Sequence, residues 1–330
     1  MIKIKRTTKP AYLDDPKVLE ETAEAIKLFA PNQSITPSLT KKRKEFKYKR
    51  YSHAAVKDAL KDMCNNKCAY CESSFLHVYY GDIEHFRPKK FVGTKKDQKI
   101  PGYYWLANDW NNLLLSCLFC NQAKTQMIEK EDELIKITLG KQNQFPLSNQ
   151  TLYNRTRSHI NWENGNDKKD DKARLIVNPC IDDPEKHFSY TKEGIVIPKK
   201  IKRNNKFIDD PKASASIEVY ALQRIYLVQE RKKRLVNLDL HINSVREVLK
   251  KLDDMDFNSN PVIINYYQDR LKAEIETLFY FTHRKMAYAA MCRQFVYEFL
   301  QSNLKKTKSV IRKVEESIHK KIDQGDIELV

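Results

Sequence analysis

Two short cysteine motifs decide how this sequence folds, CAYC at residues 68–71 and CLFC at residues 117–120. Each motif places two thiols at the ends of one tight turn, and two such turns supply the four sulfurs of a tetrahedral zinc site. The sequence therefore predicts one structural zinc ion, held by Cys68, Cys71, Cys117 and Cys120. The alternatives are chance spacing of buried cysteines, a redox pair, or disulfides. The second copy of the motif and the lack of a signal peptide favour zinc.

The 45 residues between the motifs are more than a simple zinc ribbon needs, and they contain DIEHFRPK at residues 82–89. We expect a strand here that Pro88 brings to an end, with Asp82 and Glu84 on one face and His85 on the other. Hydrolysis of a phosphodiester needs a general base and a bound cation. His85 suits the base because imidazole titrates near neutral pH, and Glu84 suits a hard-oxygen ligand for Mg²⁺. A histidine taken alone is more often a packed or surface residue, but its place between the two motifs favours catalysis.

The sequence around the second motif, WNNLLLSCLFCNQAK at residues 110–124, extends this candidate site. Asn121 is expected to open a helix after Cys120 and to offer its carboxamide oxygen to the cation. Lys124 would follow one turn later on the same face and reach phosphate. Asn112 is expected to bond the backbone and hold the loop that carries His85, although it could equally be a turn residue before an apolar strand.

Taken together, these residues resemble the HNH, or ββα-metal, endonucleases. The resemblance implies that His85 is the general base and that Glu84 and Asn121 hold a catalytic Mg²⁺ or Mn²⁺ ion. It makes Asn112 the middle, structural asparagine of the motif, and it leaves the four cysteines to a separate structural zinc. Asn121 stands where many relatives carry histidine. Arg87, Lys89 and Lys124 then become candidates for contacts with nucleic acid.

A narrower resemblance rests on IEHFRPK at 83–89, YWLANDWNNL at 104–113, FPL at 145–147 and NPCIDDPEKHF at 178–188. Lys3-Ile4-Lys5 near the start and Ala221-Leu222-Gln223-Arg224 also fit. These segments resemble PtuB, the HNH subunit of Septu-type and retron-associated anti-phage systems, over about residues 1–234. The resemblance implies a nuclease that acts with an ABC-type, PtuA-like ATPase subunit and is held in check until infection.

The charge of the chain agrees with a nucleic-acid partner, since 60 Lys and Arg outnumber 43 Asp and Glu for a net charge of +17. Residues 41–51, KKRKEFKYKRY, combine seven basic residues with three aromatics. Such a stretch can follow a phosphate backbone, which makes Lys41, Lys42, Arg43 and Lys44 candidate contacts, or it can be a solvated loop. Residues 197–206 form a second basic strip, expected in a loop because Asn204 and Asn205 interrupt it.

Hydrophobic periodicity predicts a mainly helical protein. The resemblance implies that it also contains a small zinc-stapled ββα-metal module, which makes the fold α+β overall. We expect helices at 16–29 and 54–63, a linker at 31–40, one long helix over 212–251, another from 261 towards 300, and a last one over 310–322. The expected segments are 1–63, helical and basic; 64–130, the nuclease module; 131–210, mixed; and 211–330, a helical bundle. We expect the bundle to bind either the ATPase or a second copy of this chain, and its aromatic stripe at 280–299 to pack in the core.

Three functions remain open from the sequence: a nuclease for DNA, a nuclease for structured RNA such as tRNA, and an inactive zinc-stabilised protein that binds nucleic acid. Keeping Glu84, His85, Asn112 and Asn121 together disfavours the third, because a binding protein needs neither a base nor ligands. No apolar stretch is long enough to span a membrane, so a cytoplasmic protein is expected.

Overall fold

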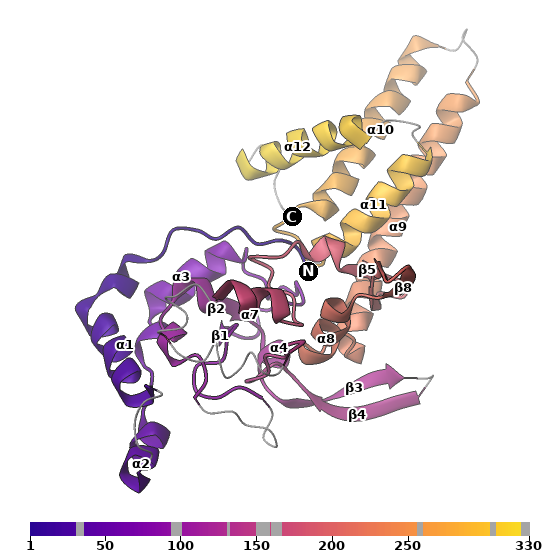
Figure 1. Cartoon of the computed structure of the whole chain (residues 1–330). Coiled ribbons are helices and arrows are strands. Elements are labelled where there is room, and N and C mark those ends of the chain that lie inside the picture. The colour runs from indigo at the N-terminus through magenta and orange to yellow at the C-terminus, as the bar shows by residue number, and fades with distance from the viewer. Residues whose placement is uncertain are drawn as a thin grey trace. The chain divides into compact units, whose positions relative to one another are not determined.

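A computed structural model describes residues 1–30, 36–93, 101–130, 133–149, 159, 167–255, 260–303 and 308–324. The chain divides into two compact units, which we call the N-terminal and C-terminal units (Figure 1). The N-terminal unit comprises Ile2–Phe188 and Val196–Ile225. The C-terminal unit comprises Met1, Ser189–Ile195 and Tyr226–Val330. The described part of the chain is mainly helical with small antiparallel sheets, as the sequence predicts.

The N-terminal unit begins with helices that the sequence signals clearly. Asp15 caps α1 (Pro16–Phe29) by accepting a hydrogen bond from the amide of Lys17, and a proline at the first helical position favours the same start. Helix α3 (Ala54–Met63) has the predicted bounds. Helix α2 (Pro37–Glu45) replaces the end of the expected linker at 31–40, because Thr36 caps it and Pro37 opens it. Residues 31–35 of that linker lie outside the described residues.

The centre of this unit is a pair of short strands, β1 (Asp82–His85) and β2 (Leu113–Ser116). They are antiparallel, with Asp82 opposite Ser116 and His85 opposite Leu113. The side chains of Leu113, Leu114 and Leu115 are completely buried, which anchors the sheet in the core. The strand expected over residues 82–85 is therefore confirmed.

Helix α4 (Leu118–Asn121) follows β2 directly and corrects one expectation. Asn121 ends this helix, and Lys124 begins strand β3 (Lys124–Lys130), which pairs with β4 (Glu133–Leu139). Asn121 and Lys124 are therefore not one turn apart on a helix. The β-branched and long side chains after Gln122 pair across a hairpin instead, because a partner strand is present.

The rest of the N-terminal unit contains α7 (Asp167–Ala173), β6 (Val196–Pro198), β7 (Lys200–Arg203), β8 (Lys206–Asp209) and α8 (Pro211–Val219). Strand β5 (Phe188–Tyr190) lies at the boundary of the units. Short 3₁₀ helices cover Ala11–Asp14, Arg50–Ser52, Tyr104–Leu106, Trp110–Asn112 and Pro184–Lys186. The expectation that the basic strip at 197–206 forms a loop is wrong. Most of the strip belongs to the β7–β8 hairpin, with Asn204 and Asn205 as its turn.

The C-terminal unit consists mainly of helices α9 (Ile225–Asp253), α10 (Pro261–Thr282), α11 (Ala289–Asn303) and α12 (Lys308–Gln324). Helices α9 and α10 lie side by side (Figure 1), where Glu274 of α10 accepts hydrogen bonds from Ser244 and His241 of α9. Phe281 and Phe299 are buried, so part of the aromatic stripe does pack the core. No described helix has the length and apolarity needed to cross a membrane.

Two long helices expected from the sequence are each broken in the structure. The helix expected over 212–251 is α8 and α9, separated by a turn in which Ala221 has a φ of 50°. The helix expected from 261 towards 300 is α10 and α11, and Tyr288 has a φ of 57° in the break. Neither break contains glycine or proline, so the sequence gives no local signal that a helix ends there, and hydrophobic periodicity predicts one continuous helix across each break.

Candidate active site and metal centre

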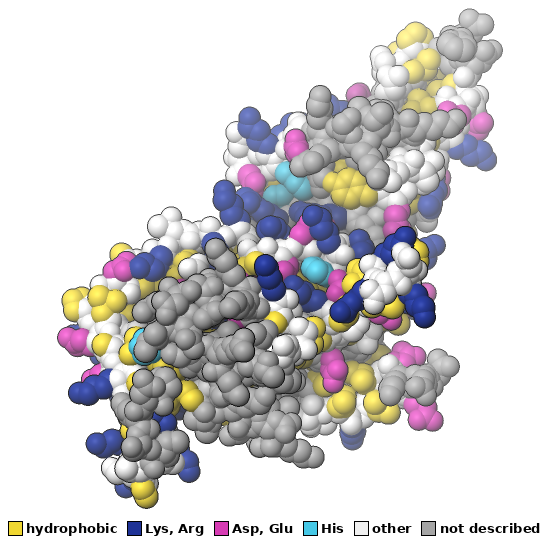
Figure 2. Space-filling view, viewed as in Figure 1, with side chains coloured by type: hydrophobic (Ala, Val, Ile, Leu, Met, Phe, Trp, Pro, Cys, Tyr) yellow, Lys and Arg dark blue, Asp and Glu magenta, His cyan; other side chains and the backbone are white. Residues whose placement is uncertain are grey.

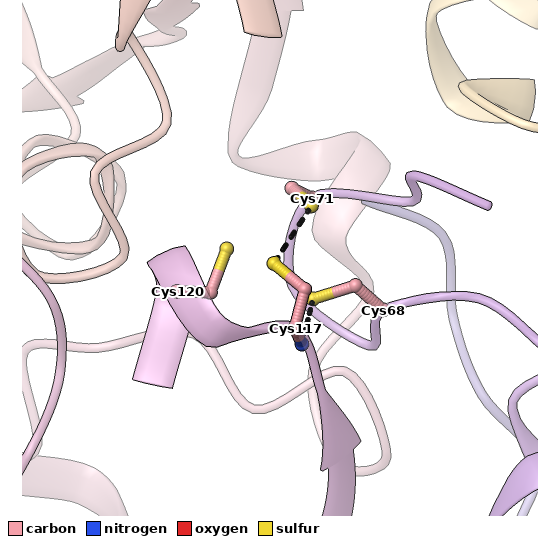
Figure 3. A group of neighbouring side chains, drawn as sticks. All are labelled: Cys68, Cys71, Cys117 and Cys120. Carbon is pink, nitrogen blue, oxygen red and sulfur yellow. Dashed lines mark hydrogen bonds between the residues drawn. The ribbon is translucent and has the colours of Figure 1, made fainter. Parts of the chain in front are cut away.

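The four cysteines of the two motifs form one buried cluster (Figure 3). Their sulfur atoms all lie within 4.8 Å of one another, and all four residues are buried. Tetrahedral thiolate ligation of one metal ion such as zinc requires this arrangement. The cluster confirms that the two motifs meet and can hold a metal.

Backbone hydrogen bonds shape the first motif around its metal-ligating sulfurs. Cys68 donates its amide to the carbonyl of Ser73 at 3.0 Å, and Ala69 donates to Leu115 of β2 at 2.9 Å. The second motif turns through α4, with Cys117 between β2 and this helix, and the amide of Cys117 donates to the sulfur of Cys68 at 3.4 Å. The sheet and the metal cluster are therefore one structural unit.

Arg224, in the turn between α8 and α9, donates to the cluster from a position far away in sequence. Its guanidinium nitrogens lie 3.5 Å from the sulfur of Cys120, 3.4 Å from that of Cys71 and 3.9 Å from that of Cys117. Arg224 is only 7% exposed. A buried cation here would offset the negative charge of four thiolates around a bound divalent metal. The sequence singled out Arg224 only as part of a family resemblance, because nothing local marks a contact 104 residues from Cys120.

The other cysteines stay outside this cluster. Cys64 is buried in the N-terminal unit, and burial raises the pKa of its thiol to about 12. Cys292 is buried in α11 of the C-terminal unit. Both are core residues, since a buried neutral thiol behaves as a small apolar side chain.

A pocket of about 600 Å³ opens beside β1 and gathers the predicted catalytic residues. Glu84, His85 and Asn121 line it, as does Lys89. Asn112 does not line it, and neither do Arg87 and Lys124. The lining also includes Tyr51, Lys57, Asp82 and Gln122, to which sequence analysis gave no catalytic role. The pocket therefore combines an imidazole, two carboxylates, four carboxamides and two lysines.

His85 is held in a defined tautomer by the surrounding chain. Its Nε2 lies 2.9 Å from the carbonyl oxygen of Ala107, which can only accept, so Nε2 carries the proton. Nδ1 is then the unprotonated nitrogen, and the ammonium of Lys89 donates to it at 3.1 Å. The ring of Tyr51 packs edge-on, with centroids 4.5 Å apart. Burial and the nearby Lys89 hold the pKa of His85 well below 6.5, so the imidazole is neutral at neutral pH.

Glu84 forms a buried ion pair with Lys141, which sequence reasoning missed. Its Oε1 lies 2.6 Å from the Lys141 ammonium, which also donates to the carbonyl of His85 at 2.8 Å. Burial raises the pKa of Glu84 and lowers that of Lys141, while each charge opposes the shift of the other. Gly140 precedes Lys141 and has a φ of 136°. A Cβ on residue 140 would lie 2.0 Å from the carbonyl oxygen of Gln122, so only glycine fits at the position that leads the chain to Lys141.

Asn121 faces the other carboxylate of β1. Its Nδ2 donates to Asp82 at 2.8 Å, and Nε2 of Gln122 donates to the same oxygen at 3.0 Å. The hydroxyl of Tyr79 bonds the second carboxylate oxygen of Asp82. Glu84 and Asn121, the two residues expected to share a cation, thus lie in one pocket but have different partners in this structure.

Asn112 holds the chain just after His85. Its carboxamide oxygen accepts from the amide of Arg87 at 2.7 Å, and its nitrogen donates to the carbonyls of Arg87 and Leu106 at 2.9 and 3.0 Å. Asn112 is only 2% exposed. The side chain therefore fixes the end of β1 against the loop before β2.

The residues expected to contact nucleic acid differ in their surroundings. Arg87 is buried and forms ion pairs with Asp170 and Asp171, so its guanidinium is occupied inside the unit instead of facing a ligand. Lys124 lies on β3, outside the pocket lining. On α2, Lys41, Lys42 and Lys44 are exposed, whereas Arg43 donates to the carbonyls of Leu28 and Ala30. Of the aromatics that follow these residues, Phe46 and Tyr48 pack against each other.

Comparisons with known proteins identify relatives of the chain. Septu protein PtuB of Bacillus mycoides (strain KBAB4) is 35% identical over 283 residues, which are 84% of this chain and 79% of that protein. Septu protein PtuB of Bacillus thuringiensis is 29% identical over 140 residues, 42% of this chain and 43% of that protein. Septu protein PtuA of Bacillus mycoides is 27% identical over 174 residues, 52% of this chain but 20% of that protein. No family model matches the chain.

The fold and the site thus define a mainly helical protein with small antiparallel sheets and a four-cysteine cluster able to hold a metal ion. Its similarity to the first of these relatives extends over most of both chains. The chain belongs to the PtuB family of Septu proteins.

Proposed function

We propose that this chain is a metal-dependent HNH endonuclease that hydrolyses phosphodiester bonds in DNA. The observation that carries the proposal is His85, whose ring is fixed by Ala107 in the tautomer that leaves Nδ1 unprotonated. Glu84 and Asn121 share its pocket. Activation of water requires a general base, and a neutral imidazole with one unprotonated nitrogen can take the proton, while the hard-oxygen donors beside it can hold a cation.

The order of elements supports an HNH assignment. The antiparallel strands β1 and β2 are followed by helix α4. His85 ends β1, Asn112 immediately precedes β2, and Asn121 ends α4. Asn112 bonds the backbone beside His85, which is the role expected of the middle asparagine. We propose residues 64–130 as the nuclease module and residues 211–330 as an interaction region.

The chemistry follows from the position of Nδ1. A water bound beside this nitrogen gives a proton to it while the water oxygen attacks phosphorus, and the bond from phosphorus to the leaving oxygen breaks. Lys89 donates to Nδ1 in this structure, so the attacking water takes the place of that ammonium. Displaced from Nδ1, Lys89 is well placed to contact a non-bridging phosphate oxygen, since it lines the same pocket.

Two metals fit the residues in different ways. The four cysteine sulfurs fit a structural zinc ion by number, spacing and burial. The oxygens of Glu84 and Asn121 are the hard donors that Mg²⁺ or Mn²⁺ prefers, and Asp82 adds a further carboxylate to the same pocket. A divalent ion bound there would stabilise the negative charge that develops on phosphate during hydrolysis.

The biological setting is inferred from family membership. PtuB relatives carry the Septu name, and we infer that this chain is the effector of a bacterial anti-phage system with a PtuA-like, ABC-type ATPase as its partner. The net charge of +17 favours a polyanionic substrate of either kind, DNA or RNA. DNA is proposed first, and structured RNA such as tRNA is the alternative that the assay must separate.

The test compares wild type, His85→Ala and His77→Ala, each with and without the ATPase partner. Supercoiled plasmid and total tRNA are incubated with Mg²⁺ or Mn²⁺, and the products are resolved on gels. His77 lies in the same proposed module but is exposed, so its variant controls for loss of a histidine. We expect wild type and His77→Ala to cleave plasmid and His85→Ala to fail while keeping its metal content.

Three outcomes would change the proposal. Cleavage by a clean His85→Ala preparation would remove His85 as the base. Cleavage of tRNA alone would replace DNA by RNA as the substrate. Binding without cleavage by wild type, in every combination of partner and ion, would favour the inactive nucleic-acid-binding protein.

A further inference from the structure

The β7–β8 hairpin is an exposed cationic element of the N-terminal unit that the proposed active site does not use. Its strands pair Lys202 with Phe207 and Arg203 with Lys206, around a turn of Asn204 and Asn205. The two asparagines have φ values of 49° and 60°, which is the geometry of a tight two-residue hairpin turn. The hairpin therefore has a defined conformation out to its tip.

The exposed tip of the hairpin carries cations and one aromatic ring, with Lys202 and Phe207 on one face and Arg203 and Lys206 on the other. Phe207 is 73% exposed, although an aromatic of this size is usually buried. Lys202, Arg203 and Lys206 are also exposed, and none of them forms an ion pair with a described residue. Figure 2 shows Lys and Arg side chains gathered where Figure 1 labels β8. One of these uncompensated positive charges, Lys202, thus stands beside the exposed ring, and the other two lie on the opposite face of the same tip.

The base of the hairpin is fixed to the N-terminal unit. Lys199 donates its amide to the carbonyl of His187 at 2.8 Å, and Asp210 donates its amide to Lys199 at 2.9 Å. The carboxylate of Asp210 bonds Nδ1 of His187 at 2.6 Å and also caps α8. Acidic groups near the hairpin are already paired, since Asp209 pairs with Lys200 at 2.8 Å. The charge and the ring are therefore presented from a firm support.

We propose that the β7–β8 hairpin binds a single-stranded stretch of nucleic acid, with an unpaired base stacked on Phe207 and phosphates contacting Lys202, Arg203 and Lys206. An exposed ring offers a stacking surface to any base, and Lys202 on the same face attracts a neighbouring phosphate. Arg203 and Lys206 attract the phosphates of nucleotides that pass round the tip to the other face. A solvated hairpin needs only the charges, whereas an exposed phenylalanine among them costs hydration and fits a stacked base. The proposal rests on the proposed function, because it assigns part of the substrate surface of the same nuclease.

The test measures binding of a fluorescein-labelled single-stranded DNA by anisotropy, over a range of salt concentrations, without Mg²⁺ or Mn²⁺. The variant Lys202→Ala/Arg203→Ala/Lys206→Ala removes the three charges, and Phe207→Ala removes the ring. The matched controls are Lys250→Ala/Lys251→Ala/Lys272→Ala, three exposed cations of α9 and α10, and Tyr226→Ala, whose ring is 74% exposed. Melting temperature and zinc content verify that every variant folds.

Each hairpin variant has its own expected signature. Each phosphate contact on a single strand contributes about 0.7 to the slope of log affinity against log salt, so the triple hairpin variant should lower the slope by about 2. Phe207→Ala should weaken binding about tenfold and leave the slope unchanged, because stacking releases no counterions. Neither control variant should show its counterpart's effect.

Several results would overturn the inference. They are hairpin variants that bind as their controls do, wild type that binds no nucleic acid, and hairpin variants that keep DNA binding but lose a purified ATPase partner. The last would make the hairpin a protein interface. Cleavage that does not depend on the hairpin would leave the nuclease proposal intact. Hairpin-dependent binding by a wild type that never cleaves would remove the nuclease proposal alone.

Discussion

Replacing Arg224 by Met should weaken both the fold and the metal centre of the N-terminal unit. The guanidinium approaches the sulfurs of Cys71, Cys117 and Cys120 at 3.4 to 3.9 Å and donates to the carbonyl of Ala221 at 2.9 Å. Methionine fills similar space but provides neither charge nor donors. The thiolates then keep their charge in a buried site without the cation that offsets it.

The magnitude follows from these contacts. Removing one partner of a buried ionic group costs about 3–5 kcal/mol, and we expect a loss in this range for Arg224→Met. Changes to residues that bond metal ligands lower metal affinity about 10- to 100-fold. Arg224→Lys should fall between wild type and Arg224→Met, because an ammonium keeps the charge but cannot reach several sulfurs with one rigid fork.

The assay pairs urea unfolding with competition for zinc against a chromophoric chelator. Arg174→Met is the matched control, because Arg174 is also buried, at 2% exposed, but pairs with Asp171 and Asp182 and not with the cysteines. It should lose comparable stability at unchanged zinc affinity. If Arg224→Met kept wild-type zinc affinity, or if both variants lost it equally, the electrostatic role given to Arg224 would be refuted.

Three further predictions concern other buried groups. Cys117→Ser should lose stoichiometric zinc and destabilise the N-terminal unit by about 4 kcal/mol or more, because metal binding contributes folding free energy; unchanged melting and zinc content would contradict this. Lys141→Met should cost about 3–5 kcal/mol by leaving Glu84 unpaired, and adding Glu84→Gln should restore much of it; additive losses in urea unfolding would refute the coupling. Burial and the neighbouring His319 lower the pKa of His283 from 6.5 to about 4, so the unfolded chain binds a proton between these values that the folded chain does not. Stability should therefore fall as pH drops from about 6.5 to about 4, more steeply in wild type than in His283→Asn; equal slopes in urea titrations would count against His283.

Several features of the candidate site could be predicted from local sequence. The spacing of the cysteine motifs indicated a metal cluster because CxxC geometry is set within one turn. The strand at residues 82–85 and the helix at 54–63 follow from short-range pattern and capping, and both have the expected bounds. The placement of His85, Glu84 and Asn121 in one pocket agrees with the motif, while the roles given to them stay predictions.

Other features depended on contacts that sequence pattern does not encode. Lys141 and Arg224 lie 56 and 104 residues from the groups that they bond, His85 and Cys120. Lys141 lies in none of the motifs, and Arg224 lies only in a segment that fits the family resemblance. The sequence made Arg87 a candidate for phosphate contact, but in the fold it is buried and paired with Asp170 and Asp171 of α7. The residue with which a charged side chain pairs is often distant in sequence, and local periodicity carries no information about such a pair.

The sequence by itself determined the four-cysteine cluster, the strand that carries His85 and most helical segments, because spacing, caps and hydrophobic period act within a few residues. Tertiary structure alone decided where the long helices break, since the left-handed residues Ala221 and Tyr288 need surrounding contacts to hold an unfavourable φ. It also decided which charges face the pocket and which are paired inside. Burial makes an unpaired charge costly, so the fold selects partners wherever they lie in the chain.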